Sequence, residues 1–279
     1  MARACKPLAV RLAWATSGSV RHATGANARR LRGAQVSRRE TRRYARGVIG
    51  RFYDAVLEIG TARATSPHTH AIQPESVEGR EPYREARQAG RGAVLVTAHV
   101  GSFESAIGTL RTIENHVHVV FQRDEHELFE TLRSRQRSRL GVREAPVDDG
   151  LATWMSLRDA LERDEVVLMQ GDRCMPGQRG VEVPFLGGHL RVPTGPARLA
   201  RLTGSPVIPV FAIGEPGGGY RVVLTDPIVP GDHPHHSNQP DPIIPIIAER
   251  IEHVVREHPE QWLCLHPVLV EDRHDSEVS

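Results

Sequence analysis

The sequence predicts a single-domain α/β fold with a mostly parallel central sheet, flanking helices and basic N-terminal helices. Two observations support this prediction. Apolar runs of strand length alternate with helical segments over the last two-thirds of the chain, which is the pattern of strands joined by crossover helices. The first 51 residues differ because they are rich in arginine and have helical periodicity. A chain of 279 residues is long enough to bury a substantial core.

Five apolar runs are expected to form the sheet. They are residues 93–99 (AVLVTAH), 117–122 (VHVVFQ), 165–172 (EVVLMQGD), 206–213 (PVIPVFAI) and 220–229 (YRVVLTDPIV). The turn GEPGGG joins the last two and predicts a hairpin. Helical patterns are present at residues 75–90, 150–164, 194–204 and 243–259. Because helices and strands alternate, we expect both faces of the sheet to be covered.

The N-terminal segment is predicted to be helical. Tyr44, Val48 and Ile59 recur at helical spacing within residues 38–59. Ser37 followed by Glu40 forms a capping box, which marks where this helix begins. We expect residues 1–60 to be a membrane-facing part of the same domain and residues 61–279 to form the α/β core.

The charge of the chain is unevenly distributed. Residues 1–51 carry twelve arginines and Lys6 against the single acidic residue Glu40, a local net charge of +12 in a chain whose total is +2. Such a segment is typical of a protein that binds an anionic membrane or a nucleic acid, but a pair of solvated helices also has this pattern. Three widely spaced cysteines (Cys5, Cys174, Cys264) argue against a disulfide scaffold.

No stretch approaches the roughly 18 apolar residues that a membrane span requires. Residues 5–20 are too interrupted for a span and lack a convincing signal-cleavage site. They suit an amphipathic helix with Leu8, Leu12 and Trp14 toward lipid. We therefore expect a peripheral or monotopic protein.

The first candidate site follows the first core strand. His99 ends that strand, Gly101 permits a turn, Ser102 is a suitable N-cap, and Glu104 lies in the first turn of the next helix. A carboxylate on one imidazole nitrogen would fix the tautomer, so that the other nitrogen could take a proton from an alcohol. The helix N-terminus would suit an oxyanion or a phosphate. Since this spacing often occurs by chance, the pair alone does not establish a site.

A second candidate region begins where the third strand ends. Asp172 and Arg173 follow that strand. A charged pair at this position is expected either in a functional site or in a surface salt bridge at the rim of the sheet. Residues 177–188 are rich in glycine and lack a helical pattern, which favours a binding loop. Thr194 is expected to cap a helix with Gly195 in its first turn, giving another N-terminus that suits an anion. Trp262 and His266 are interpreted as core and sheet-edge residues.

Four motifs, in order, carry a family resemblance. HVGSFE, GDRCMPGQRGVEVPFLGG, PTGPARLARLTGSPVIPVF and PEQWLCLHP together resemble the bacterial lipid A biosynthesis acyltransferase family. That family includes lauroyl and myristoyl transferases and phosphatidylinositol mannoside acyltransferases. The early segment GANARRLRGAQVSRRETRRYARGVIGRFYDAVLEI is similar to the family's N-terminal helices. The resemblance covers nearly the whole chain. The His-x4-acid motif (HX4E here) is shared by glycerolipid acyltransferases more broadly.

The resemblance implies an O-acyltransferase that moves a fatty acyl group from acyl-CoA or acyl carrier protein to a hydroxyl of a membrane glycolipid. It implies His99 as the catalytic base and Glu104 as its acidic partner. The substrate-binding positions that it implies are Arg123, Asp172, Arg173, Glu182, Thr194 and Gly195. Neither a metal nor a cofactor is implied. The expected location is the cytoplasmic face of the cell membrane, on an anionic surface, without a nucleic-acid partner.

Three alternatives remain from the residues themselves. A serine hydrolase could use Ser102 or Ser105, but GSFES is not a G-x-S-x-G elbow. A nucleic-acid binder could use the basic segment, although its aromatic residues Trp14, Tyr44 and Phe52 are better placed for packing than for stacking on bases. A lipid-binding protein with this fold but no turnover is the third.

Overall fold

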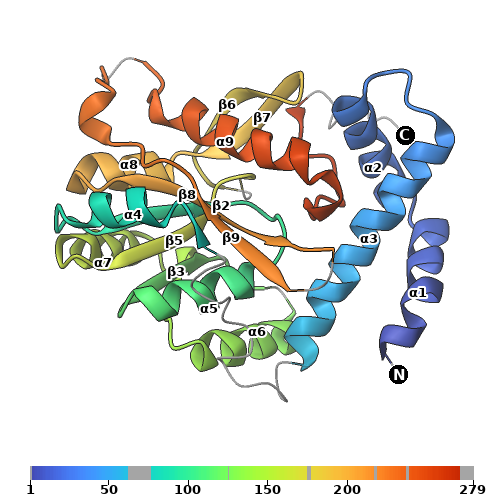
Figure 1. Cartoon of the computed structure of the whole chain (residues 1–279), viewed down its shortest axis with the longest axis horizontal. Coiled ribbons are helices and arrows are strands. Elements are labelled where there is room, and N and C mark those ends of the chain that lie inside the picture. The colour runs from blue at the N-terminus through green and yellow to red at the C-terminus, as the bar shows by residue number, and fades with distance from the viewer. Residues whose placement is uncertain are drawn as a thin grey trace.

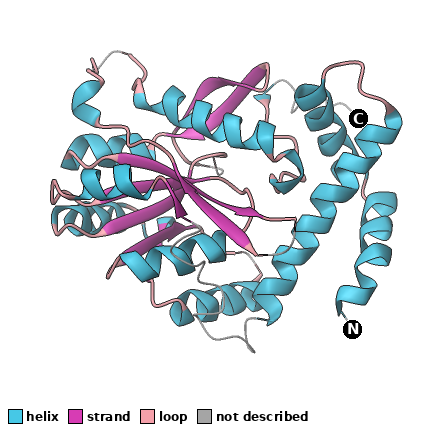
Figure 2. Cartoon of the chain, viewed as in Figure 1, coloured by secondary structure: helices cyan, strands magenta, loops and turns pink. Residues whose placement is uncertain are grey.

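The computed structural model describes residues 2–61, 77–124, 126–174, 177–216, 219–236 and 239–270. These residues form one α/β domain in which helices surround a central sheet (Figure 1, Figure 2). The fold class predicted from the sequence is therefore confirmed.

The sheet contains seven strands within the described residues, in the order β1-β9-β8-β2-β5-β3-β4. Their bounds are β1 Val77–Glu78, β2 Ala93–Thr97, β3 Val117–Phe121, β4 Arg143–Pro146, β5 Val166–Gln170, β8 Val207–Gly214 and β9 Tyr220–Leu224. Neighbouring strands are parallel, except that β8 and β9 form the predicted antiparallel hairpin. All five predicted strands are present. The structure adds β1 and β4, two short strands at the edges of the sheet.

Both faces of the sheet are covered, as predicted. Helices α7 (Leu151–Glu162), α8 (Gly195–Thr203) and α9 (Ile243–Glu257) pack on one face, and α4 (Arg80–Arg87) and α5 (Phe103–Ile113) on the other. The central strand β2 shows how covering both faces of the sheet determines the residues of a strand. Its side chains alternate between the two hydrophobic clusters, so every residue of the strand is buried and the run is continuously apolar until Thr97. Helix α6 (Glu127–Arg139) lies beside β4.

The basic helices form a layer at one side of the sheet (Figure 1). They are α1 (Ala2–Thr16), α2 (Gly18–Arg32) and α3 (Arg38–Thr61). The predicted capping box begins α3: the Glu40 amide donates to Ser37 Oγ at 3.2 Å, and the Ser37 amide donates to Glu40 Oε2 at 3.0 Å. Tyr44 is fully buried against Ala28, so this layer has a small core of its own.

The aromatic residues of this layer behave differently from one another. Trp14 lies under the guanidinium groups of Arg42 and Arg46, whose carbons are 4.9 and 5.7 Å from the ring centroid. Phe52, which was expected to pack, is 44% exposed, and Leu8 and Leu12 are 71% and 61% exposed. Among the described residues, none of the helices has the length and apolar character needed to cross a membrane.

The glycine-rich segment corrects one prediction. A binding loop was expected over residues 177–188, but the chain forms a two-stranded hairpin of β6 (Gly180–Phe185) and β7 (Gly188–Pro193). Leu186 and Gly187 make the turn with φ of 50° and 71°, which suits a two-residue hairpin. One face of the hairpin buries alternate apolar side chains, which are Val183, Phe185, Leu190 and Val192.

Candidate active site

Two neighbouring parallel strands, β2 and β5, bring His99 and Asp172 together. Thr97 and Gln170 are register partners at the carboxyl ends of these strands, and each candidate residue stands two positions further on. His99 Nδ1 and Asp172 Oδ1 are 2.7 Å apart, although 73 residues separate them in sequence. The pair therefore lies outside the carboxyl ends of the strands, where open α/β sheets place their sites.

Trp262 holds the other oxygen of the same carboxylate. Its indole Nε1 donates to Asp172 Oδ2 at 3.0 Å, and both side chains are fully buried. Asp172 thus accepts a hydrogen bond on each oxygen, one from an imidazole and one from an indole. Because the two donors bind different oxygens of the carboxylate, they fix its rotation.

The backbone around His99 is held by the same part of the chain. After the 3-10 turn η5 (Pro259–Gln261), Trp262 forms an antiparallel bridge with Val100. The Gly101 amide donates to the Gln261 carbonyl at 3.0 Å, and the Leu263 amide donates to the His99 carbonyl at 2.7 Å. We call residues 261–263 the bracing segment, since it pairs with the turn that carries His99.

Gly101 is required in this turn for two reasons. Its φ is +66°, in the left-handed region that favours glycine. A Cβ at this position would lie 1.8 Å from the carbonyl oxygen of Ala212, which accepts a hydrogen bond from the Ser102 amide at 3.1 Å. The close approach to β8 therefore leaves no space for a side chain.

Ser102 begins α5 as predicted. Its hydroxyl accepts a hydrogen bond from the Ser105 amide at 3.2 Å, which confirms the N-cap. The positive end of this helix consequently lies beside the His99 turn. Ser102 and Ser105 are only 3% and 0% exposed. A serine nucleophile must reach a substrate, so this burial argues against the hydrolase alternative.

The charges of the pair suit a neutral imidazole beside an ionised carboxylate. Burial would raise the pKa of Asp172, but its electrostatic interactions with His99 and Arg173 and the hydrogen bonds from His99 and Trp262 hold that pKa well below its usual range. Burial lowers the pKa of His99; Asp172 opposes this shift, whereas Arg173 and Arg133 add to it. An ionised carboxylate only accepts hydrogen bonds, so Nδ1 carries the proton and Nε2 keeps its lone pair. The side chain of His99 is 28% exposed, which leaves it accessible.

A match to a known protein family adds to this geometry. Residues 5–270 match the family described as bacterial lipid A biosynthesis acyltransferase. The chain belongs to this family. The resemblance inferred from the four motifs is therefore confirmed.

Curated members of the family are similar to this chain at modest identity. A phosphatidylinositol mannoside acyltransferase of Mycobacterium tuberculosis strain H37Rv is 28% identical over 202 residues, which is 72% of this chain and 61% of that protein. The protein of the same name from Mycolicibacterium smegmatis is 29% identical over 192 residues, covering 68% of this chain and 60% of that protein. The matches thus span about three-fifths of the length of these relatives.

Glu104 is the acidic residue of the predicted His-x4-acid motif. Its backbone lies in the first turn of α5, but its side chain is outside the described part of the structure. The position predicted for it, on a nitrogen of His99, is held by Asp172. The role of Glu104 therefore stays a prediction, and the described geometry offers Asp172 as the orienting carboxylate.

Arg173 braces the site from the side opposite His99. Its Nη2 lies 3.6 Å from Asp172 Oδ2 and donates to the Leu263 carbonyl at 3.4 Å. Its Nη1 lies 3.5 Å from His266 Nε2. Arg173 thus links the buried carboxylate to the chain just after Trp262, and its substrate-binding role stays a prediction.

Arg123 binds residues of the turn that follows β4. It follows β3, two strands from β2 in the sheet. Its guanidinium donates to both oxygens of Asp149 at 2.7 and 3.2 Å, and its amide donates to Asp148 at 2.9 Å. Arg123 therefore anchors the turn η3 (Val147–Asp149), and a role in substrate binding stays a prediction.

The remaining predicted substrate-binding residues lie on the β6–β7 hairpin and at the start of α8. Glu182 is exposed on β6 opposite Arg191, and among the described residues no contact joins Glu182 to His99. Thr194 holds the predicted N-cap position, but its side chain makes no capping hydrogen bond to the helix. Its hydroxyl instead donates to the Arg179 carbonyl at 3.5 Å. A Cβ on Gly195 would lie 2.7 Å from the Trp154 ring, so this glycine lets α8 pack on α7.

Sequence reasoning missed two residues of the site. Trp262 is a core residue, as interpreted, but it is also the donor to Asp172. The available signal was that a buried indole N–H needs an acceptor. Arg133 of α6 lies close enough to lower the pKa of His99, and nothing in its local sequence marks this. The described residues hold no group of three or more His, Cys, Asp or Glu able to bind a metal ion.

Proposed function

We propose that this protein transfers a fatty acyl group from an acyl thioester to a hydroxyl of a membrane glycolipid. The observation that carries the proposal is the buried Asp172 carboxylate on His99 Nδ1, at the start of α5, in a chain of an acyltransferase family. The donor is the thioester of coenzyme A or of acyl carrier protein.

In the proposed reaction His99 Nε2 takes the proton of the acceptor hydroxyl. The oxygen attacks the thioester carbonyl carbon, and a tetrahedral oxyanion forms. The carbon–sulfur bond then breaks, the acyl group stays on the acceptor oxygen, and the thiolate receives the proton from His99. Asp172 stabilises the imidazolium that exists between these two proton transfers.

Two sources of oxyanion stabilisation are near the proposed base. Backbone amides at the start of α5 lie at the positive end of the helix dipole. The second is Arg133 of α6, whose charge acts on His99 and whose Nη1 lies 3.9 Å from Asp124 Oδ2. We propose that Glu104, in the same turn, acts as a second carboxylate of the site, while Asp172 orients the base.

The basic helices support a membrane location for the proposed reaction. The local charge of +12 suits an anionic leaflet, and each basic side chain near such a surface contributes about 1 kcal/mol. Leu8 and Leu12 project from α1 and are available to enter lipid. We propose peripheral or monotopic binding at the cytoplasmic face, where an acyl thioester is available.

The names of the relatives supply the first acceptor to test, a phosphatidylinositol mannoside. The purified protein would be incubated with acyl-CoA or acyl carrier protein and a membrane lipid extract, and the lipids analysed by mass spectrometry. The proposal predicts a lipid heavier by one acyl group and dependent on both substrates. Thioester hydrolysis alone, with no acylated lipid in any extract, would reject acyl transfer.

A further inference from the structure

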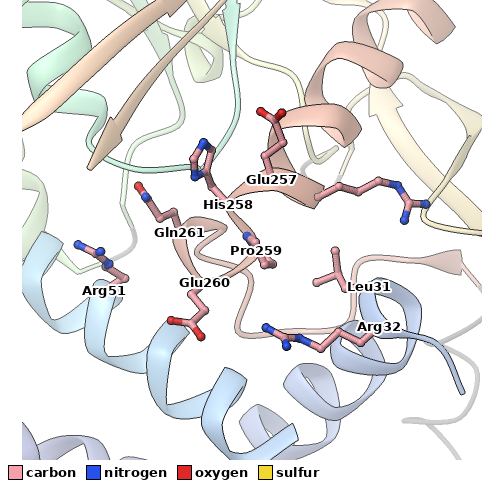
Figure 3. A pocket seen from close by; sticks show the side chains of 9 residues that line it. Leu31, Arg32, Arg51, Glu257, His258, Pro259, Glu260 and Gln261 are labelled. Carbon is pink, nitrogen blue, oxygen red and sulfur yellow. The ribbon is translucent and has the colours of Figure 1, made fainter. Parts of the chain in front are cut away.

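A polar cleft of about 450 Å³ separates the basic helices from the end of α9 (Figure 3). Three arginines reach it from three different helices: Arg32 from α2, Arg51 from α3 and Arg256 from α9. His258 and Gln261 line it on the side of the sheet, as Figure 3 shows. None of these residues belongs to the proposed reaction.

Two of the arginines make no ion pair within the described residues, although the charge of Arg32 acts on Glu40 and lowers the pKa of that carboxyl. Within the described part of the chain, no carboxylate lies at ion-pair distance from Arg32 or Arg51. Arg256, in contrast, pairs with Glu252 at 2.6 Å. Glu257 and Glu260 also line the cleft, and their carboxylates oppose an anion there. Glu260 packs so closely on α3 that a Cβ on Gly47 would lie 2.6 Å from its Oε2.

Arg51 lies at the edge of the sheet that carries the candidate active site. A Cβ on Gly214, the last residue of β8, would lie 3.4 Å from Arg51 Nη1. The Gln261 side chain bonds to Gly214 twice, accepting from its amide at 2.8 Å and donating to its carbonyl at 2.9 Å. Since β8 is parallel to β2, its carboxyl end lies at the same edge of the sheet as His99. Gln261 is also the first residue of the bracing segment.

We propose that this cleft binds the phosphate group of a phosphate ester. A guanidinium group can bind two phosphate oxygens at once, and three guanidinium-bearing side chains line this one cleft. The nearby carboxylate of Glu260 keeps the site weak, so that the ester can leave after turnover. The ester is either the headgroup of an anionic phospholipid or the phosphates of coenzyme A. This choice of source rests on the proposed acyl transfer, whereas the binding itself does not.

Calorimetric titration with two probes tests the assignment. The probes are coenzyme A and short-chain phosphatidylinositol below its micelle concentration. The wild-type protein should bind at least one of them. The double variant Arg32→Gln/Arg51→Gln should bind that probe about tenfold more weakly or worse, because two charge-assisted contacts are lost. Glu260→Gln should bind severalfold more tightly. The control Arg43→Gln removes the same charge from an exposed position on α3 outside the cleft, and should bind like the wild type.

Each outcome of these titrations either supports or overturns the assignment. Loss of coenzyme A binding in the double variant assigns the cleft to the acyl donor, and loss of phosphatidylinositol binding assigns it to a lipid headgroup. If neither probe binds the wild type, if the double variant binds normally, or if Arg43→Gln weakens binding equally, the assignment is overturned. His99→Ala should retain this binding, so that failure of the acyl-transfer proposal and failure of this one are distinguishable.

Discussion

The indole of Trp262 donates a hydrogen bond to Asp172 at 3.0 Å, and this contact leaves the second carboxylate oxygen facing His99. The position in which Trp262 holds the carboxylate affects how His99 can act as a base. A carboxylate that bonds a fixed donor on one side presents the imidazole with an acceptor whose rotation is already set. The proton on His99 Nδ1 is then held, and Nε2 is left as the base.

Removing only the indole donor should slow the chemical step. Trp262→Phe keeps an aromatic ring against Phe185 but removes the indole donor from Asp172 Oδ2, which keeps only Arg173 Nη2 at 3.6 Å. A hydrogen bond to a charged group is worth about 1.5–3 kcal/mol, so we expect kcat to fall roughly tenfold to a hundredfold. The Michaelis constant for the donor should change little. Unchanged kcat in a stably folded variant, checked by urea unfolding, would contradict the positioning role.

Replacing the carboxylate by an amide should be more severe. In Asp172→Asn the indole of Trp262 requires the amide oxygen, which turns the amide NH2 toward His99 Nδ1. Nδ1 must then accept, and Nε2 becomes protonated. The analogous change in a serine protease triad costs about 10⁴-fold in kcat, so we expect a loss of about 10³-fold or more. The exposed Asp232→Asn is the matched control.

The same measurement separates the two acids of the site. If Asp172 orients the base, Glu104→Gln should retain more activity than Asp172→Asn. The reverse order, with Asp172→Asn close to wild type, would return the orienting role to Glu104. Initial rates with saturating acyl donor provide the comparison.

The pH profile should report the environment of His99. Burial, Arg173 and Arg133 lower the pKa of His99 below its ordinary 6.5, and activity requires the neutral ring. The acid limb of kcat/KM should therefore have its midpoint below 6.5, with activity present above it. Arg133→Gln removes one positive charge, so the pKa of His99 rises and the limb moves to higher pH. Arg135→Gln, exposed on the same helix, should leave the limb in place.

Gly101→Ala should destabilise the protein by more than the cost of a positive φ at this position. Gly90 has nearly the same φ, 64° against 66°, but no atom lies within 4 Å of a Cβ there. Gly90→Ala should therefore cost only backbone strain, of about 1 kcal/mol. Gly101→Ala adds a clash with the Ala212 carbonyl and should unfold at clearly lower urea concentration, with activity lost. Equal midpoints for the two variants would show that the turn adapts.

The fold could be predicted from local sequence because its determinants are local. Each core strand is an apolar run, and the caps at Ser37 and Ser102 are set by residues within three positions. The β6–β7 hairpin was missed because its turn uses Leu186 with Gly187 instead of the usual Asn-Gly or Asp-Gly. The short strands β1 and β4 are too brief to show a pattern.

The site was only partly predictable because its contacts are not local. The sequence marks His99 and Asp172 as strand-end residues, but only the register of β2 with β5 shows that they touch. Trp262 reaches Asp172 across 90 residues. Arg123 shows the same limit, since the family resemblance implied a substrate role but only the fold shows that its guanidinium pairs with Asp149.

The most direct test of the account is the rate of acyl transfer by purified His99→Ala, measured as acylated lipid per minute beside the wild type. The account predicts that transfer falls to background, while circular dichroism and the urea midpoint stay close to wild type and binding of the acyl donor is retained. Transfer at the wild-type rate by this folded variant would contradict His99 as the base, and with it the proposed mechanism.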